Sequence, residues 1–473
     1  MPSDVSAPVA PPLTEPGASA GLWHRLLVGS TLLALIVQTY AGAVLRGAYG
    51  DGAFFMTHLA AQGGLRIIQP ARYFSEIITQ LPVMLAMRLG LRGPHWVALA
   101  FSLSTNILPG LITLCCLPAL PRAWRRLFVF PAFIYLAGIL SAQFESVTEG
   151  LVATPYFWLL LCLVSFGRLT YLRSCLILAL TLGSLHLHEQ TMFLGPILAA
   201  SALLRLREEE GLLPKLVLLV AALGALASAA IGADYAIHPQ FVSERGSLID
   251  SLLHFQWLYI PHFGLNLTCA LGLLAALCII AVMVWPAIGR GVALVFLVVA
   301  TLSALATFRV HALVVPAAQF TARDIAAFMS LPAGILLIVA RRQPALAARS
   351  TQGTVLGIVA ALGLGASLWH VAATRDWLQF RSHLVVLLQS RTGIIPWSAV
   401  IGTADPRQVA MIGKMMWPWS NPDLSLVLLP RQVVTSIIAY PDWYSGWRPY
   451  ALSDPKTLPQ IPHLTYDYLP RGG

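Results

Sequence analysis

The strongest constraint in this sequence is a series of apolar segments, each about as long as the hydrocarbon core of a bilayer requires. A helix that crosses a membrane needs roughly 17–25 predominantly apolar residues. Eleven segments come close to or meet this length, over residues 26–45, 95–119, 127–143, 150–166, 173–188, 190–206, 214–233, 265–285, 291–308, 325–340 and 354–371. The sequence therefore predicts an all-α polytopic membrane protein with about eleven transmembrane helices.

The composition supports this fold class. Hydrophobic residues make up 57% of the chain and charged residues only 11%, whereas soluble domains carry about 25% charged residues. The formal net charge is +10, which in a soluble protein would suggest nucleic acid as a partner. No basic run is interleaved with aromatic residues, so we expect a lipid bilayer and no nucleic acid as partner.

The basic residues also indicate an orientation. With the N-terminus inside, the inner loops hold Arg122, Arg125, Arg126, Arg168, Arg173, Arg205, Arg207, Lys215, Arg290, Arg341, Arg342 and Arg349. This pattern follows the positive-inside rule. Most acidic residues then collect outside, namely Asp51, Glu76, Glu145, Glu149, Glu189, Asp234, Glu244, Asp250 and Asp324. Because ionisable groups near membrane depth are costly and usually functional, the outer face is the predicted working face.

Three segments differ in character from the spans. Residues 1–21 are rich in Pro, Ala and Ser, which predicts a disordered cytoplasmic tail before a transmembrane domain over 22–371. Residues 70–92 carry charges and predict an amphipathic helix in the outer interface, with a shorter one at 54–62. Over 372–473 short apolar runs alternate with turn residues, which predicts a small extracytoplasmic α/β or β-rich domain.

Asp51 stands where the first apolar segment has just ended, between two glycines in "GDGAFF". It either caps the following helix or takes the proton from an attacking hydroxyl, as a carboxylate general base does. Near the outer ends of two later spans, Arg309, His311 and Arg323 form a candidate phosphate site. Arginine binds phosphate bidentately through its planar fork, and the alternative is that these side chains reach out to lipid headgroups.

Three further groups of polar residues are candidates for substrate binding. They are Arg72, Tyr73 and Glu76 on the amphipathic helix, Glu145 and Glu149 spaced i,i+4, and His186, His188 and Glu189 in "HLHEQ". The first group would line the entry for a lipid donor. The second would bind acceptor hydroxyls or form a solvated loop. The third would bind sugar or phosphate or form a polar hairpin, and because a metal ion would need a further ligand, no metal is expected.

The long first outer loop, its two interfacial helices and the aspartate at its start resemble the GT-C superfamily of membrane glycosyltransferases. The resemblance implies a transferase of the bacterial inner membrane that uses a polyprenyl-phosphate-linked sugar in cell-envelope polysaccharide synthesis. Asp51 would be the base, no cofactor would be needed, and the acceptor would be a glycan, lipid or protein. Some members carry a second acidic residue where this chain has Gly52.

Two other functions remain open from sequence. One is a transporter or flippase for lipid-linked sugars, and the other is a non-catalytic membrane component of envelope polysaccharide assembly. A transporter should place ionisable residues near the middle of the bilayer and show paired repeats. The charges of this chain lie at one face and no repeat is evident, which favours the enzyme.

Overall fold

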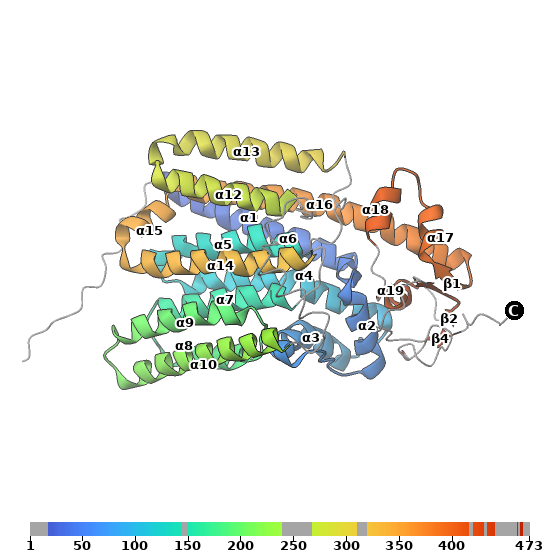
Figure 1. Ribbon diagram of the computed structural model, residues 1–473, viewed down its shortest axis with the longest axis horizontal. Helices are drawn as coiled ribbons and strands as arrows, with labels where there is room; N and C mark the ends of the chain where they lie inside the picture. The colour runs from blue at the N-terminus through green and yellow to red at the C-terminus, as the bar shows by residue number, and fades with distance from the viewer. Residues whose placement is uncertain are drawn as a thin grey trace, which may run out of the picture.

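A computed structural model describes residues 18–143, 149–238, 267–309, 319–415, 420–429, 433–439, 461 and 464–466. Long helices dominate it, and Figure 1 shows them side by side as a bundle. They are α1 (Ala18–Ala43), α4 (Pro94–Ala119), α7 (Gly150–Ser165), α8 (Tyr171–Ser184), α9 (Thr191–Leu206), α10 (Leu212–Ile237), α12 (Leu267–Val284), α13 (Gly289–Ala306), α14 (Gln319–Arg342) and α16 (Gly353–Ser390). A further rod joins α5 (Val129–Ile134), a π-helical turn (Tyr135–Ile139) and α6 (Leu140–Ala142).

Each of the predicted apolar segments coincides with one of these rods, so the prediction of an all-α bundle is confirmed. Within the described residues, five helices are long and apolar enough to cross a membrane, in α1, α4, α10, α13 and α16. Large apolar side chains point outward from the bundle, including Leu223 on α10 and Val295 and Leu302 on α13. An apolar exterior of this kind suits contact with lipid chains, which offer no water to solvate polar groups.

Two shorter helices lie between α1 and α4 in the chain, at one end of the bundle (Figure 1). They are α2 (Asp51–Gln62) and α3 (Tyr73–Arg88), preceded by the 3₁₀ turns η1 (Arg46–Ala48) and η2 (Pro70–Arg72). The predicted helices over 54–62 and 70–92 are thus confirmed as helices. Both pack against α4, and α2 also packs against α19 (Asn421–Leu428).

At the end of the bundle opposite α2 and α3, basic side chains donate hydrogen bonds to helix carbonyls. The Nε of Arg173 donates to the carbonyl of Leu163 at 3.1 Å, and Arg205 Nη1 donates to that of Val164 at 2.6 Å, both at the end of α7. The last carbonyls of a helix lack partners within it, and cations are favourable there. Arg341 and Arg342 pair with Glu208 at the same end, where η3 (Arg122–Phe128), η6 (Pro286–Ile288) and α15 (Pro344–Ser350) make the connections.

The helix α16 continues unbroken past residue 371 to Ser390, out of the bundle and into the C-terminal part (Figure 1). The elements described there are β1 (Gly393–Pro396), α17 (Trp397–Gly402), α18 (Val409–Lys414), α19, β2 (Val433–Val434), β3 (Ser436–Ala439) and β4 (Thr465–Tyr466). β1 pairs with β3 and β2 with β4, both in parallel. A second apolar core joins these elements to α2 and to the outer part of α16, with Phe55, Trp377 and Ile437 among its buried residues.

Candidate functional site

Asp51 is the first residue of α2, a few residues beyond the end of α1. The preceding Gly50 has φ 64 and ψ −135, a conformation that is open to glycine and strained for other residues. Gly50 holds the N-cap position and no side chain caps it, so Asp51 lies in the first turn instead. The helix dipole favours an anionic group at this position.

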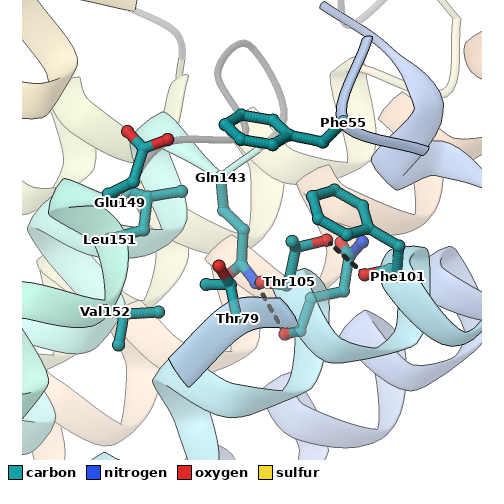
Figure 2. Close-up of a pocket in the computed structure, with 9 residues that line it drawn as sticks. Phe55, Thr79, Phe101, Thr105, Gln143, Glu149, Leu151 and Val152 are labelled. Atoms are coloured by element: carbon teal, nitrogen blue, oxygen red, sulfur yellow. Dashed lines mark hydrogen bonds between the residues drawn. The ribbon is translucent and has the colours of Figure 1, made fainter. Parts of the chain in front are cut away.

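The next turn of α2 lines a pocket. Its walls come from α2, α3, α4, the end of α6 and the start of α7, through Phe55, Thr79, Phe101, Thr105, Asn106, Gln143, Glu149, Leu151 and Val152 (Figure 2). Asp51 and Phe55 are four residues apart on one helix, so they share a face at roughly 5–6 Å. Asp51, which is half-buried, therefore lies one helical turn from a side chain that lines this pocket.

A charged cluster brings together residues from three helix starts at the same end of the molecule. Arg72 Nε lies 3.1 Å from both carboxylate oxygens of Glu189, and its Nη1 lies 3.5 Å from Glu149 Oε2. His188 Nδ1 is 3.3 Å from Glu189 Oε2. Burial alone would raise the pKa of Glu189, but Arg72 and His188 outweigh it and lower that pKa to about 2. Glu189 is therefore an anion held in a fixed position.

The pKa of Glu76 is shifted in the opposite direction from that of Glu189. Its side chain is 1% exposed and accepts hydrogen bonds from the backbone N–H groups of Ile68 at 2.8 Å and Gln69 at 3.3 Å. Burial, followed by the charge of Glu149, raises its pKa to about 8 against the opposing effects of these N–H groups and of Arg72. Glu76 is consequently protonated at neutral pH, and it anchors the segment before η2.

This raised pKa predicts a pH dependence of stability. In the unfolded chain Glu76 titrates near 4.5 and in the folded protein near 8. Between these values only the folded protein holds the proton, so we expect the free energy of unfolding to fall as pH rises through this window. Glu76→Gln imitates the neutral carboxyl and should flatten that fall in melting temperatures recorded from pH 5 to 8. The exposed Glu210→Gln is the control, and an equally steep fall in Glu76→Gln would contradict the assignment.

A second polar cluster lies deeper, around the buried Arg46. Its Nη2 donates to Gln38 Oε1 at 2.5 Å and to Asn106 Oδ1 at 3.3 Å, and its Nη1 donates to Thr374 Oγ1 at 2.9 Å. These contacts join α1, α4 and α16. Asn106 also lines the pocket, so the Arg46 cluster supports the pocket from behind.

The structure brings together some of the predicted substrate residues and leaves others apart. Arg72, Glu149, His188 and Glu189 meet in the charged cluster, with Glu76 beside it. Tyr73 is 43% exposed and packs edge-on against Phe74, and His186 packs edge-on against Tyr235. Glu145 and His311 lie outside the described residues, as does the side chain of Arg323 on α14, whereas Arg309 is exposed just after α13.

Several polar residues that line or support the pocket were not among the predicted site residues. Gln38, Thr105, Asn106 and Gln143 lie within predicted apolar segments, and Arg46 directly follows the first of them. The signal that would have found them is their residue type, because polar side chains inside a membrane span are expensive and are retained for a reason.

No group of three or more His, Cys, Asp or Glu side chains in the described part of the chain is arranged to hold a metal ion. The arrangement is instead that of a polar pocket with a carboxylate at its edge and a fixed ion cluster beside it. Such groups can accept hydrogen bonds from hydroxyls and take up a proton. Comparison of the chain with protein-family models, with curated proteins and with solved structures finds no match, so the case for a function rests on these residues.

Proposed function

We propose that this protein is a membrane glycosyltransferase that moves a sugar from a polyprenyl-phosphate-linked donor to an extracytoplasmic glycan, lipid or protein. One observation carries the proposal: Asp51 begins α2 directly beyond the first membrane helix, on the face whose next turn lines a polar pocket. A base at that point can meet an acceptor from outside and a donor whose phosphate stays at headgroup level. In the proposed reaction Asp51 is the general base.

The proposed chemistry uses one proton transfer and one displacement. A hydroxyl oxygen of the acceptor attacks the anomeric carbon of the donor sugar, and its proton passes to the carboxylate of Asp51. The bond between the anomeric carbon and the phosphate oxygen breaks, and its electron pair leaves with the lipid phosphate. That developing charge needs fixed cations, for which we propose Arg309, His311 and Arg323. Glu149, His188 and Glu189 are proposed to hydrogen-bond sugar hydroxyls.

The proposal includes eleven transmembrane helices in the inner membrane of a bacterium, with the N-terminus in the cytoplasm. It is supported by the distribution of charge: Arg173, Arg205, Arg341 and Arg342 lie at one end of the bundle, and the cluster around Glu189 lies at the other. The C-terminal part packs at the acidic end, against α2. That end would face the periplasm.

Reporter fusions test this orientation. A fusion at Ala123, in the loop after α4, should report the cytoplasm, and a fusion at Gly393, after α16, should report the periplasm. Paired alkaline phosphatase and fluorescent protein fusions give opposite signals on the two sides. The same side for both fusions would contradict the span count and, with it, the outer location of Asp51.

The experiment that tests the activity is sugar transfer by the purified protein in proteoliposomes. The donors are undecaprenyl-phosphate-linked sugars, the acceptor is a cell-envelope glycan fraction, and the readout is release of undecaprenyl phosphate. Sugar transfer that depends on Asp51 supports the proposal. If no donor gives sugar transfer, the proposal is overturned.

A further inference from the structure

Gln143, directly after α6, is held in place by a break in the hydrogen bonding of α4. Pro109 lies inside α4, and because proline has no backbone N–H, it cannot bond to the carbonyl four residues earlier. That carbonyl belongs to Thr105. Gln143 Nε2 lies 3.3 Å from the backbone carbonyl oxygen of Thr105 and 2.6 Å from that of Asn106, and it donates a hydrogen bond to both. The side chain therefore replaces a helical hydrogen bond that Pro109 removes.

This contact also fixes which way the amide faces. Both partners are carbonyl oxygens, which only accept hydrogen bonds, so the NH₂ group must face α4 and the Oε1 atom must face away. Gln143 is 4% exposed, and its Oε1 is buried with no hydrogen-bond partner in the part of the chain that the structure describes. A buried acceptor in this state is costly unless a donor reaches it.

The pocket around Gln143 offers further acceptors. The carboxylate of Glu149 lies on one side, and the stacked rings of Phe55 and Phe101, with centroids 5.7 Å apart, lie on the other (Figure 2). The hydroxyl of Thr79 donates to the carbonyls of Ser75 and Glu76, and the hydroxyl of Thr105 donates to that of Phe101. Since the protons of these hydroxyls are already used, the polar groups of the pocket, above all Gln143 Oε1 and the carboxylate of Glu149, can accept a hydrogen bond from a ligand.

The size of the pocket limits that donor to a small group. Its space of about 10 Å³ corresponds to roughly one water molecule, so it accommodates a single hydroxyl group and not a whole sugar ring. Asp51 lies one helical turn from Phe55, the residue of α2 that lines the pocket.

We propose that Gln143 Oε1 accepts a hydrogen bond from one hydroxyl of the donor sugar, which enters this pocket while the anomeric carbon faces Asp51. Gln143 is then a specificity-determining residue for the sugar on the carrier. The inference rests on the proposed glycosyltransferase function and adds to it a contact with the sugar rather than with the lipid phosphate.

Two variants separate this role from the structural one. Gln143→Met keeps the length of the side chain and removes both the donor and the acceptor. The double variant Pro109→Ala/Gln143→Met returns a backbone N–H to α4, so the carbonyl of Thr105 no longer needs Gln143. Pro109→Ala alone is the matched control, and the melting temperature of each variant reports folding.

The measurement is binding of lipid carriers to the full chain in nanodiscs by native mass spectrometry. The probes are undecaprenyl phosphate and undecaprenyl phosphate linked to glucose, galactose, mannose or arabinose. We expect the wild type and Pro109→Ala to bind at least one sugar-bearing carrier more tightly than the bare carrier. In both variants that lack Gln143 this preference should fall by about 10-fold, which corresponds to one hydrogen bond, while binding of the bare carrier stays unchanged.

A preference that returns in the double variant would overturn the inference, because Gln143 would then only support the break in α4. A wild type that binds bare and sugar-bearing carriers equally would also overturn it and leave the pocket to a buried water. If no carrier binds the wild type at all, the proposed function itself fails, and this inference fails with it.

Discussion

Asp51→Asn is expected to lower the rate of sugar transfer by about 10²–10⁴-fold, the usual loss when a general base is removed. Asparagine keeps the size and shape of the side chain at the start of α2 but cannot take the proton of the acceptor hydroxyl. The variant should fold and should bind the lipid-linked donor as the wild type does. Transfer is measured as release of undecaprenyl phosphate in proteoliposomes, and donor binding is measured separately.

Asp234→Asn is the matched control for this substitution. Asp234 lies near the end of α10 at the same end of the bundle, and its side chain is 71% exposed, so transfer should remain at the wild-type rate. Transfer by Asp51→Asn at that rate would leave Asp51 as a structural residue of the first turn of α2. Asp51→Glu keeps the carboxylate but moves it by one methylene, and partial activity would show that position as well as charge matters.

Arg72→Met is expected to destabilise the protein by roughly 3 kcal/mol, because it leaves the carboxylates of Glu149 and Glu189 buried without their cation. The side chains of Arg72, Glu149 and Glu189 are 17%, 9% and 19% exposed, so water compensates only weakly. The readout is the apparent melting temperature of the detergent-purified protein. The exposed Arg168→Met, at the opposite end of the bundle, should leave it nearly unchanged.

A second variant distinguishes lost charge from lost packing in this cluster. Arg72→Met/Glu189→Gln removes the carboxylate that Arg72 contacts with two equal distances of 3.1 Å, so much of the lost stability should return. A double variant as unstable as Arg72→Met would mean that the guanidinium acts mainly through packing. The cost of the single substitution should also shrink as the pH falls, because burial without Arg72 raises the pKa of Glu189 and the carboxylate then takes up a proton.

The sequence by itself determined where the helices of the bundle run. A span-length apolar segment is a local property, since its backbone hydrogen bonds close within the segment and its side chains need only apolar surroundings. Even the short helices α2 and α3 follow from local pattern, although their ends shifted by a few residues and α16 extended well past residue 371. The start of α2 at Asp51 is likewise local, because Gly50 permits the required turn.

Only the tertiary structure decided which polar residues meet. Arg72 and Glu189 are 117 residues apart in the chain, and Arg46 and Thr374 are 328 apart, so no local pattern pairs them. The orientation of the Gln143 amide depends on a proline in another helix, and the raised pKa of Glu76 depends on its burial and on the charge of Glu149 at the start of α7. Long-range contacts follow from how helices pack, because packing joins side chains that the sequence keeps apart.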